Sequence, residues 1–363
     1  MFSRTKCCIC GDVDLTLRLK TPRVPVTYSP PPINSLPVDD ETVDLEWGGC
    51  CKCGSLQLMT LGDPSIIYNS AHHGTSASPL WKEHHQQFAE FVRDRIPPAA
   101  QVIEIGGAGG NLASLLRASV STYTILDLEK HEDLLLDGVH FEQGNCETYK
   151  FLGTHTLILS HVFEHLYIPL DFLMNVRKCG VKYIFLANPV MQVGSEVLPI
   201  DIEHTYFADD LDVEDMFMRH GYVLQQKIFF RKHAFFMCYK LSESVSANRH
   251  LRPGRDALLV SAFNKRKDQL TEIDLTEPSY IVPAGQFGQL IYYYTKSINI
   301  IAYLDNDVNK QGRRVYGTPY FAQPFETIRH VNCPRVVIYV RHYAPEMVSQ
   351  LRSINPGVRI VIV

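Results

Sequence analysis

The stretch Val102-Ile-Glu-Ile-Gly-Gly-Ala-Gly-Gly110 decides how this chain is expected to fold. An apolar run ends in an acidic residue and a cluster of glycines, and residues 111–117 then favour a helix. Glycine is needed where a strand turns into a helix over a ligand, because the backbone must turn tightly and the ligand must lie against it. The stretch therefore predicts the first strand and turn of a nucleotide-binding α/β unit, although a purely structural tight turn would use glycine in the same way.

A second acidic residue lies about 20 residues further along, which is the spacing typical of such a unit. It is Asp127, and it ends the apolar run Thr124-Ile-Leu-Asp127. An aspartate at the tip of the second strand can accept hydrogen bonds from ribose hydroxyls. Its position favours a cofactor site over a structural turn.

The overall composition is that of a globular protein. Of 363 residues, 45% are hydrophobic and 20% are charged, and the formal net charge is -4. This length predicts two or three domains. No basic surplus argues for a nucleic-acid partner, and no apolar run of about 18 residues predicts a membrane span. Because the N-terminus also lacks the apolar core of a signal peptide, we expect a cytoplasmic protein without a membrane partner. The sequence leaves the oligomeric state open.

Six of the ten cysteines lie in two short motifs near the N-terminus, Cys7-Cys8-Ile-Cys10-Gly11 and Cys50-Cys51-Lys-Cys53-Gly54. In each C-x-x-C-G motif, two thiolates can reach one ion across a tight turn. Four thiolates make a closed tetrahedral Zn²⁺ site with a structural role, and Cys8 or Cys51 could substitute in either motif. The expected ligands are Cys7, Cys10, Cys50 and Cys53.

The segment between the two motifs holds six prolines, from position 22 to position 37, and little apolar periodicity. Such a segment buries too little apolar surface to order itself, so we expect the metal to hold it. The four remaining cysteines are scattered in apolar surroundings, which is typical of cytoplasmic thiols and not of a disulfide framework.

From residue 101 onward, apolar strands alternate with helices, which predicts a parallel sheet. An amphipathic helix over residues 81–95 precedes this region, and an antiparallel pair of strands closes it. A polar stretch over residues 245–253 leads to a second, shorter α/β unit. The expected elements of the first unit are strands at 101–105, 122–127, 140–142, 155–160, 182–187, 222–230 and 234–241, and helices at 111–118, 169–178 and 210–220.

The glycine cluster, with an acid two residues before it, resembles motif I of class I S-adenosylmethionine (SAM) methyltransferases. The resemblance implies that Glu104 or its neighbours face the methionine part of SAM, and that the glycine backbone packs against it. It also places Asn145, which follows the third expected strand together with Glu147, near the adenine, although a plain turn fits there equally well. The glycines concerned are Gly106, Gly107 and Gly109.

Over nearly its whole length, the chain is similar to the sugar C-methyltransferases of deoxysugar biosynthesis. After the four-cysteine region come Ser160-His-Val-Phe-Glu-His165 and then Asp305-Asn-Asp-Val-Asn-Lys-Gln-Gly312 followed by Tyr316-Gly-Thr318. In that family a methyl group passes from SAM to a carbon beside the keto group of a nucleotide-linked sugar. The resemblance implies an α/β protein in three parts: a zinc module at 1–68, a Rossmann-like class I SAM-methyltransferase domain at 69–244, and a smaller Rossmann-like domain at 245–363.

Carbon methylation requires a base for a carbon-bound proton and donors that hold the resulting enolate. The resemblance implies that His204 is the base and that Glu203 orients it or balances its charge, because a nearby carboxylate raises the basicity of an imidazole. His165 would hydrogen-bond the keto or enolate oxygen. His161 is expected to be one of the cofactor-binding residues. A packed histidine and a helix cap are the structural alternatives for His204 and His165.

Two departures from the family pattern bear on this assignment. Asp201 stands where the family has a tyrosine, and His72 or His73 stands where its serine-rich loop has a catalytic tyrosine, unless these two histidines only lie in a solvated loop. The first alternative is therefore O- or N-methylation, with His204 deprotonating a hydroxyl or an amine. The second is a protein that binds SAM or a partner without turnover, which would have no need for a base beside the methyl donor.

Overall fold

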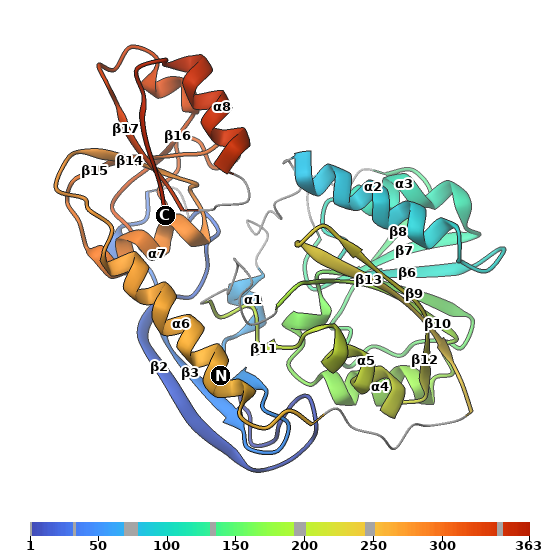
Figure 1. The fold of residues 1–363 in the computed structure, drawn as a ribbon. Helices are drawn as coiled ribbons and strands as arrows, with labels where there is room; N and C mark the ends of the chain where they lie inside the picture. Colours follow the sequence, from blue (N-terminus) through green and yellow to red (C-terminus); the bar gives the residue numbers. More distant parts are fainter. Residues whose placement is uncertain are drawn as a thin grey trace. The chain divides into compact units, whose positions relative to one another are not determined.

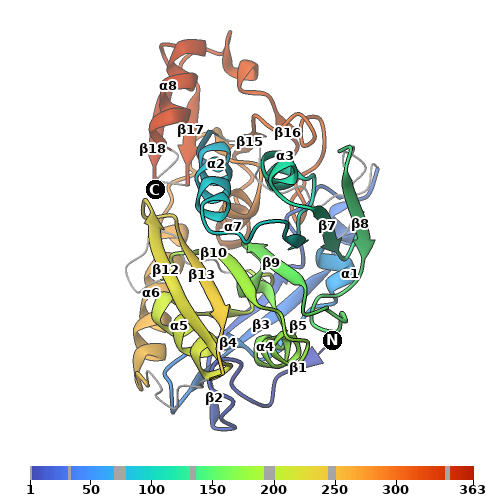
Figure 2. The same ribbon diagram turned by 90° about the vertical axis from the view of Figure 1, so that its right-hand side faces the viewer.

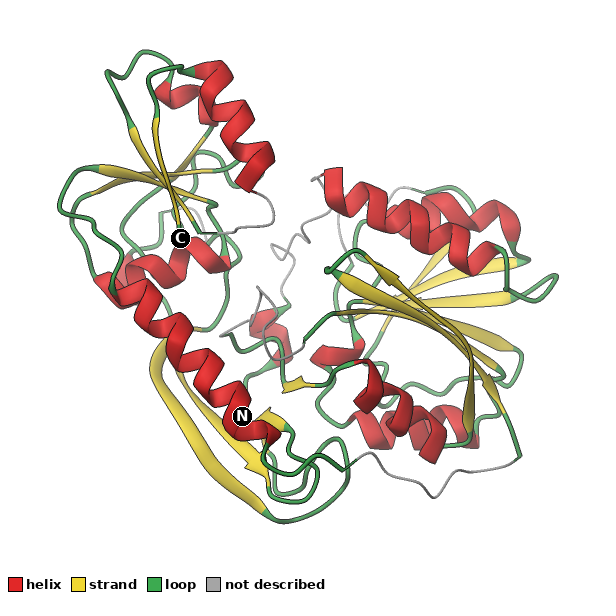
Figure 3. Ribbon diagram, viewed as in Figure 1, coloured by secondary structure: helices red, strands yellow, loops and turns green. Residues whose placement is uncertain are grey.

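The computed structural model describes residues 2–31, 34–68, 79–130, 136–191, 201–243, 251–339 and 344–363, and the remaining residues are drawn in grey in Figure 3. The chain forms two compact units. The first contains residues 1–20 and 46–259, and the second contains residues 21–45 and 260–363. The predicted sites at His72 and His73 lie outside the described residues.

The first unit is built on a seven-stranded sheet, with its strands labelled in Figure 1 and seen from a second side in Figure 2. Numbered by their order in the chain, the strands lie in the order 6-7-5-4-1-2-3 across the sheet. All pairs are parallel except those made by β13, which runs antiparallel to both of its neighbours. The strands are β6 (Gln101–Ile105), β7 (Thr122–Asp127), β8 (Val139–Gln143), β9 (His155–Ser160), β10 (Tyr183–Pro189), β12 (Tyr222–Phe230) and β13 (Ala234–Leu241).

This strand order confirms the Rossmann-like class I SAM-methyltransferase fold expected from the sequence. The chain reverses its direction of travel across the sheet between β6 and β9, which are hydrogen-bonded neighbours. In open α/β sheets, ligands bind outside the carboxyl ends of the strands at such a switch point. The fold therefore places the glycine turn after β6 and the loop after β9 at the same edge of the sheet.

Helices cover both faces of this sheet, as Figure 1 shows. The helices α2 (Pro79–Arg93) and α3 (Asn111–Leu116) lie on one face, where Phe88 and Leu112 join the core. The helices α4 (Pro169–Lys178) and α5 (Asp210–Arg219) lie on the other face, where Phe172 and Val213 join a second core. Because both faces are buried in the middle of the sheet, the central parallel strands β6, β9 and β10 are mostly apolar, which is why the sequence reveals them clearly, whereas the edge strand β8 is largely exposed.

The N-terminal residues pair with the same unit. The short strands β1 (Phe2–Ser3) and β5 (Thr60–Leu61) pair with each other. A four-stranded sheet has the order β11-β4-β3-β2, in which β4 (Leu56–Leu58) pairs with β11 (Tyr206–Phe207), just before α5. The other two strands are β2 (Leu15–Pro25) and β3 (Thr42–Cys50), and the short helices are η1 (Pro37–Asp39) and α1 (Pro64–Ile67).

The second unit is a smaller Rossmann-like fold, as expected. Its five strands are all parallel and lie in the order β16-β15-β14-β17-β18. The strands are β14 (Ser279–Val282), β15 (Ile300–Leu304), β16 (Ala322–Gln323), β17 (Arg335–Ile338) and β18 (Arg359–Ile362), with helices α7 (Gln286–Thr295), η4 (Phe325–Ile328) and α8 (Ala344–Ile354). Helix α6 (Arg255–Thr271) precedes them and was not expected from the sequence.

The proline-containing segment 21–45 belongs to the second unit and not with the cysteine motifs, which differs from the three-part expectation. Arg314 forms an ion pair with Asp40, and both side chains are buried. The side-chain amide of Gln289 donates to the carbonyl of Thr27 at 3.1 Å. These contacts hold the segment within the second unit. They join residues that are far apart in the chain, so they leave no periodic signal in the sequence.

No helix among the described residues is both long enough and apolar enough to span a membrane.

Candidate active site

The turn after β6 shows why glycine is needed there. Gly106 has a φ of 69°, and a Cβ atom on it would lie 2.6 Å from Cγ2 of Val162, in the loop after β9. A side chain on Gly107 would meet the carboxyl group of Glu104 at about 3 Å. A Cβ atom on Gly109, in contrast, would meet nothing within 4 Å. The first two glycines permit close packing, and the third faces open space in which a ligand can lie.

Two acidic residues lie beside this turn. Asp127 accepts the backbone N–H of Ala108 at 3.1 Å and that of Leu128 at 2.7 Å, so its carboxylate already supports the turn. Glu104 is buried and accepts the hydroxyl of Tyr123 at 2.8 Å. Burial raises the pKa of Glu104 to about 7, although the hydrogen bond from Tyr123 lowers it. An ionised carboxylate has about four lone-pair sites, so these two hydrogen bonds are compatible with the expected ribose contact.

Asn145 lies directly after the third strand of the sheet, and its side chain accepts the backbone N–H of Glu147 at 2.9 Å. The Gly144 N–H donates to the carbonyl of Asp127 at 2.8 Å, which brings this turn beside the expected ribose site. The Glu147 carboxylate accepts the N–H of Ile168 at the start of α4. Glu147 therefore caps a helix, while Asn145 keeps the position expected for an adenine contact.

The loop after β9 carries His161 and the short helix η3 (Phe163–His165). Nε2 of His161 lies 3.2 Å from Nε2 of His84, which is fully buried on α2. Burial lowers the pKa of His161 well below its usual value, and neighbouring histidines lower it further. His161 is therefore neutral, and its backbone has a φ of 54°, an uncommon value for a residue with a side chain.

His204 is held by Asp201 and not by Glu203. Nδ1 of His204 lies 3.0 Å from one Asp201 oxygen and 3.2 Å from the other. Burial lowers the pKa of His204, but the charge and hydrogen bond of Asp201 outweigh it, with weaker help from Glu164 and Glu203, and raise it to about 9. Burial acts to raise the pKa of Asp201, but His204 lowers it overall, so the pair favours an ionised carboxylate. Asp201 therefore makes the hydrogen bond to His204, while Glu203, expected to orient His204 or balance its charge, acts on it through its charge.

His165 faces His204, with ring centroids 4.7 Å apart. Its Nδ1 lies 2.9 Å from the carbonyl oxygen of Glu203. A carbonyl only accepts hydrogen bonds, so Nδ1 carries the proton and Nε2 of the neutral ring offers a lone pair. Burial lowers the pKa of His165 to about 4, even though Glu164 raises it. Neutral His165 is thus an acceptor at Nε2, which differs from the enolate donor that the sequence suggested.

Backbone contacts bring these residues together across 39 positions of the chain. The Thr205 N–H donates to the carbonyl of Glu164 at 3.1 Å, and the Thr205 hydroxyl donates to the carbonyl of Leu166 at 2.6 Å. The Tyr206 hydroxyl donates to the carbonyl of Phe163. The segment around His204 is therefore fixed on the loop after β9.

The guanidinium of Arg4 holds the same two segments. Arg4 is 5% exposed, and its Nη2 donates to the carbonyls of Leu166 and Tyr167, each at 3.0 Å, and to the Thr205 hydroxyl at 2.8 Å. Nη1 donates to the carbonyls of Thr205 and Leu58. Arginine suits this position because its planar group carries five N–H donors in a fixed geometry.

The four predicted zinc ligands come together, and Cys8 and Cys51 are not in the cluster. The Sγ atoms all lie within 4.8 Å of one another, and two of the pairs are 3.6 Å apart. For a tetrahedral ion with Zn–S distances of about 2.3 Å, two sulfurs lie about 3.8 Å apart, so the cluster fits zinc. The backbone explains the motif, because Gly11 and Gly54 have positive φ and donate N–H to the carbonyls of Cys7 and Cys50.

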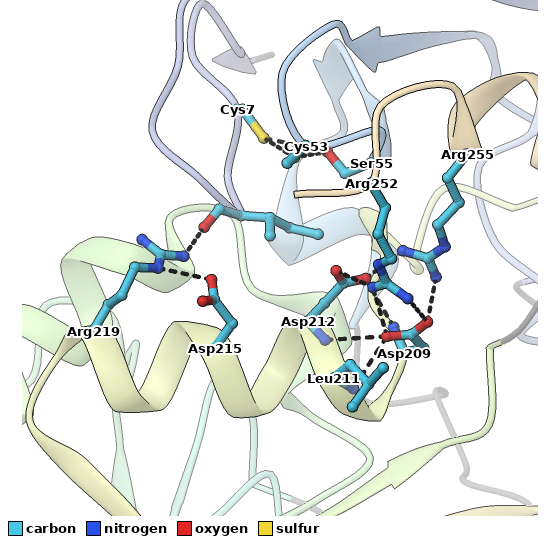
Figure 4. A network of polar contacts seen from close by, with 11 residues as sticks. Cys7, Cys53, Ser55, Asp209, Leu211, Asp212, Asp215, Arg219, Arg252 and Arg255 are labelled. Carbon is cyan, nitrogen blue, oxygen red and sulfur yellow. Dashed lines mark hydrogen bonds and ion pairs between the residues drawn. The ribbon is translucent and has the colours of Figure 1, made fainter. Parts of the chain in front are cut away.

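Helix α5 ties this cluster to the sheet, as Figure 4 shows. At one end, Arg219 pairs with Asp215 at 2.8 Å and donates to the carbonyl of Ile9, inside the first cysteine motif. At the other end, Arg252 and Arg255 pair with Asp209 and Asp212, which form the first turn of the helix. The N–H of Arg252 also donates to the carbonyl of Cys53 at 3.3 Å.

Sequence reasoning missed the roles of Arg4, Glu164 and Asp201. A lone arginine three residues before a cysteine motif carries no signal, and Glu164 is a residue inside the His161–His165 string. Asp201 was noticed only as a departure from the family tyrosine. Its Oδ1 accepts the N–H of Glu203, two residues on, at 2.8 Å, which is an Asx turn, and also the N–H of His204 at 2.7 Å.

No protein-family model matches the sequence, and no curated protein matches it. Among solved structures, the chain is similar to a SAM-dependent methyltransferase from Mesorhizobium loti, with a TM-score of 0.36 and 10% identity over 46% of this chain and 100% of that one. The chain is also similar to a magnesium protoporphyrin IX methyltransferase from Synechocystis PCC 6803, solved with bound SAH. The TM-score is 0.38 and the identity is 13%, over 48% of this chain and 92% of that one. For the YcgJ protein of Bacillus subtilis, the TM-score is 0.37 and the identity is 12%, over 44% of this chain and 100% of that one. The fold assignment rests on strand order and polarity.

Replacing Arg4 by methionine should destabilise the first unit by at least about 2 kcal/mol, because several buried carbonyls would lose their donors. Both tryptophans, Trp47 and Trp81, lie in the first unit, so tryptophan fluorescence during urea unfolding measures that unit. Arg95→Met is the matched control, because Arg95 is partly exposed and donates to only one backbone carbonyl, that of Phe91, besides the side chain of Gln226. Equal shifts of the urea midpoint in the two variants would contradict the role of Arg4 in holding these segments together.

Proposed function

We propose that this chain is a SAM-dependent methyltransferase that acts on a small polar acceptor, with a nucleotide-linked keto sugar as the leading candidate. One observation carries the proposal. The first unit holds both the glycine turn with Asp127 and the imidazole of His204, which is held by the Asp201 carboxylate. The His204 segment lies beside the loop after β9. Val162, one residue from His161, packs against Gly106, so the cofactor turn and the histidine loop are in contact.

The cofactor role rests on three groups. The turn over residues 106–110 would lie against the methionine part of SAM, the Asp127 carboxylate would accept the ribose hydroxyls, and Asn145 would lie near the adenine. SAM supplies an activated methyl group when it is bound. The protein's residues have to orient that group toward the acceptor and exclude water.

Gly109→Val tests the cofactor site without disturbing the turn, since a Cβ atom there meets nothing within 4 Å. We expect the melting temperature to stay unchanged and the affinity for S-adenosylhomocysteine, measured by calorimetry, to fall at least tenfold. Asp127→Ala should weaken binding by about 1–3 kcal/mol, but it also removes support from the turn. Wild-type affinity in both variants would exclude this turn as the cofactor site.

The proposed base is His204. With Nδ1 donating to Asp201, Nε2 of the neutral ring, which a pKa of about 9 favours at alkaline pH, carries the lone pair that would take a proton from the acceptor. The carboxylate fixes the ring and stabilises the imidazolium that forms, which makes Asp201 a positioning residue. Glu203 is buried and acts on His204 more weakly, through its charge.

O-methylation is the second candidate, and the structure offers a specific reason for it. An aspartate–histidine pair is the arrangement that activates hydroxyl groups. Neutral His165 offers an acceptor toward His204 and not the donor that an enolate needs. Both features suit an acceptor whose hydroxyl group donates its proton to His204.

His204→Asn should lower turnover by roughly 10²–10⁴, the usual contribution of a positioned general base, while leaving the affinity for S-adenosylhomocysteine unchanged. Asp201→Asn should lower turnover more than Glu203→Gln, because Asp201 makes the hydrogen bond. A larger loss of turnover in Glu203→Gln than in Asp201→Asn would show that Glu203 is the residue that orients His204. With a keto-sugar substrate and no SAM, carbon methylation also requires exchange of the carbon-bound proton for deuterium. Methylated product without such exchange would select O-methylation.

We also propose that the four-cysteine cluster holds a structural zinc ion. A closed set of four thiolates leaves no open coordination position, so the ion would stabilise the N-terminal region and not take part in chemistry. All four thiols are buried, which supports a structural role.

Purified protein should therefore contain one tightly held zinc ion per chain by elemental analysis. Cys10→Ser combined with Cys53→Ser should lose the metal and make residues 2–20 sensitive to protease, because metal binding and local folding are coupled. The matched control is Cys8→Ser combined with Cys51→Ser, which should keep the metal. Protease resistance of this segment in metal-free wild type would contradict the structural role.

A further inference from the structure

We propose that Glu164, His165 and His204 form a second metal site that binds a divalent ion of the Zn²⁺ type. Each residue offers one ligand atom, and these atoms lie within 4.8 Å of one another. All three residues belong to the first unit, and they lie where the loop after β9 meets the segment before β11. The proposal rests on this geometry and does not require methyl transfer.

Both imidazoles are already oriented as metal ligands usually are. A histidine that binds a metal almost always donates its other ring N–H to a carboxylate or a backbone carbonyl, which fixes the tautomer. Nδ1 of His204 lies 3.0 Å from the Asp201 carboxylate, and Nδ1 of His165 lies 2.9 Å from the Glu203 carbonyl. The nitrogen that remains on each ring is Nε2. On His165 it carries a lone pair, and on His204 the cation would displace the proton that its raised pKa favours.

Glu164 supplies the independent observation. It is fully buried, and among the described residues neither carboxylate oxygen has a hydrogen-bond partner. Buried polar groups are nearly always hydrogen-bonded, and a buried carboxylate without such partners is costly. Its Oε1 lies 3.8 Å from Nε2 of His165 and 3.5 Å from Nδ1 of His161. A cation between Glu164 and the two imidazoles would satisfy the carboxylate.

The separation between Glu164 and His165 needs only a small adjustment, whereas the separations from His204, which are within 4.8 Å, have to shorten by up to about 1.5 Å. On a tetrahedral zinc ion, with metal–ligand distances of about 2.0–2.1 Å, two ligand atoms lie about 3.3 Å apart. The separation of 3.8 Å between Glu164 and His165 therefore has to shorten by about half an ångström, which a small side-chain rotation supplies.

The donor set indicates the kind of ion. Imidazole nitrogen suits Zn²⁺ and its neighbours, whereas Mg²⁺ prefers a shell of oxygen atoms. Three protein ligands also leave a coordination position for water or for an oxygen atom of a ligand, unlike the closed four-cysteine cluster. The second site would therefore exchange its ion more readily than the first.

The same atom of His204 serves the cation here and the proton in the proposed reaction. When a cation is bound, Nε2 of His204 is therefore occupied and cannot act as the base. Binding measured without SAM and without acceptor does not depend on turnover, so failure of either proposal can be recognised separately.

Zinc binding to the full chain tests the site. Protein with its cysteine cluster loaded and excess metal removed would be titrated with Zn²⁺ in a calorimeter, with no SAM present. We expect wild type to bind one further ion. Glu164→Gln and His165→Asn should each lose at least tenfold in affinity, and Asp201→Asn should lose 10–100-fold, the usual effect of removing a ligand's supporting carboxylate.

The matched control is His220→Asn. Its Nδ1 also pairs with a carbonyl, that of Met216, but it lies outside the proposed site, so binding should equal that of wild type. No further ion in wild type, wild-type affinity in both Glu164→Gln and His165→Asn, or Mg²⁺ bound as tightly as Zn²⁺ would each overturn the proposal.

Discussion

The buried guanidinium of Arg4 is the interaction on which the candidate site most depends. It donates to carbonyls of three segments that are far apart in the chain: Leu58 in β4, Leu166 and Tyr167 after η3, and Thr205 before β11. The last two segments carry His165 and His204. A buried carbonyl without a donor is costly, so Arg4 stabilises the mutual positions of these segments together with the hydrogen bonds that Thr205 and Tyr206 make.

This arrangement gives the N-terminal cysteine region a role in the site, even though no cysteine lies there. Arg4 lies three residues before Cys7, and the Gln57 side chain accepts the N–H of Cys8 at 2.9 Å. Helix α5, which follows the His204 segment, is bonded to Ile9 through Arg219. A metal that orders the cysteine motifs would therefore also stabilise the loops that hold the histidines.

Sequence reasoning recovered the sheet because each buried strand is an apolar run and each turn carries glycine or an acid. The boundaries of α4, β12 and β13 agree residue for residue with the expectation. It failed for the proline-containing segment 21–45, whose contacts are made by Arg314 and Gln289 from far along the chain. The resemblance to the sugar C-methyltransferases named His165 and His204. It could not identify Asp201 as the hydrogen-bonded partner, because that depends on the turn that residues 201–204 make.

The central claim is that the glycine turn binds SAM with the methyl group directed toward the two histidines. A crystal structure of the full chain grown with S-adenosylhomocysteine tests it most directly. The account predicts ribose hydroxyls on the Asp127 carboxylate, the homocysteine part against the backbone of residues 106–110, and the sulfur atom facing His204. Binding with the sulfur directed away from His165 and His204, or no ligand at this turn at saturating concentration, would contradict it.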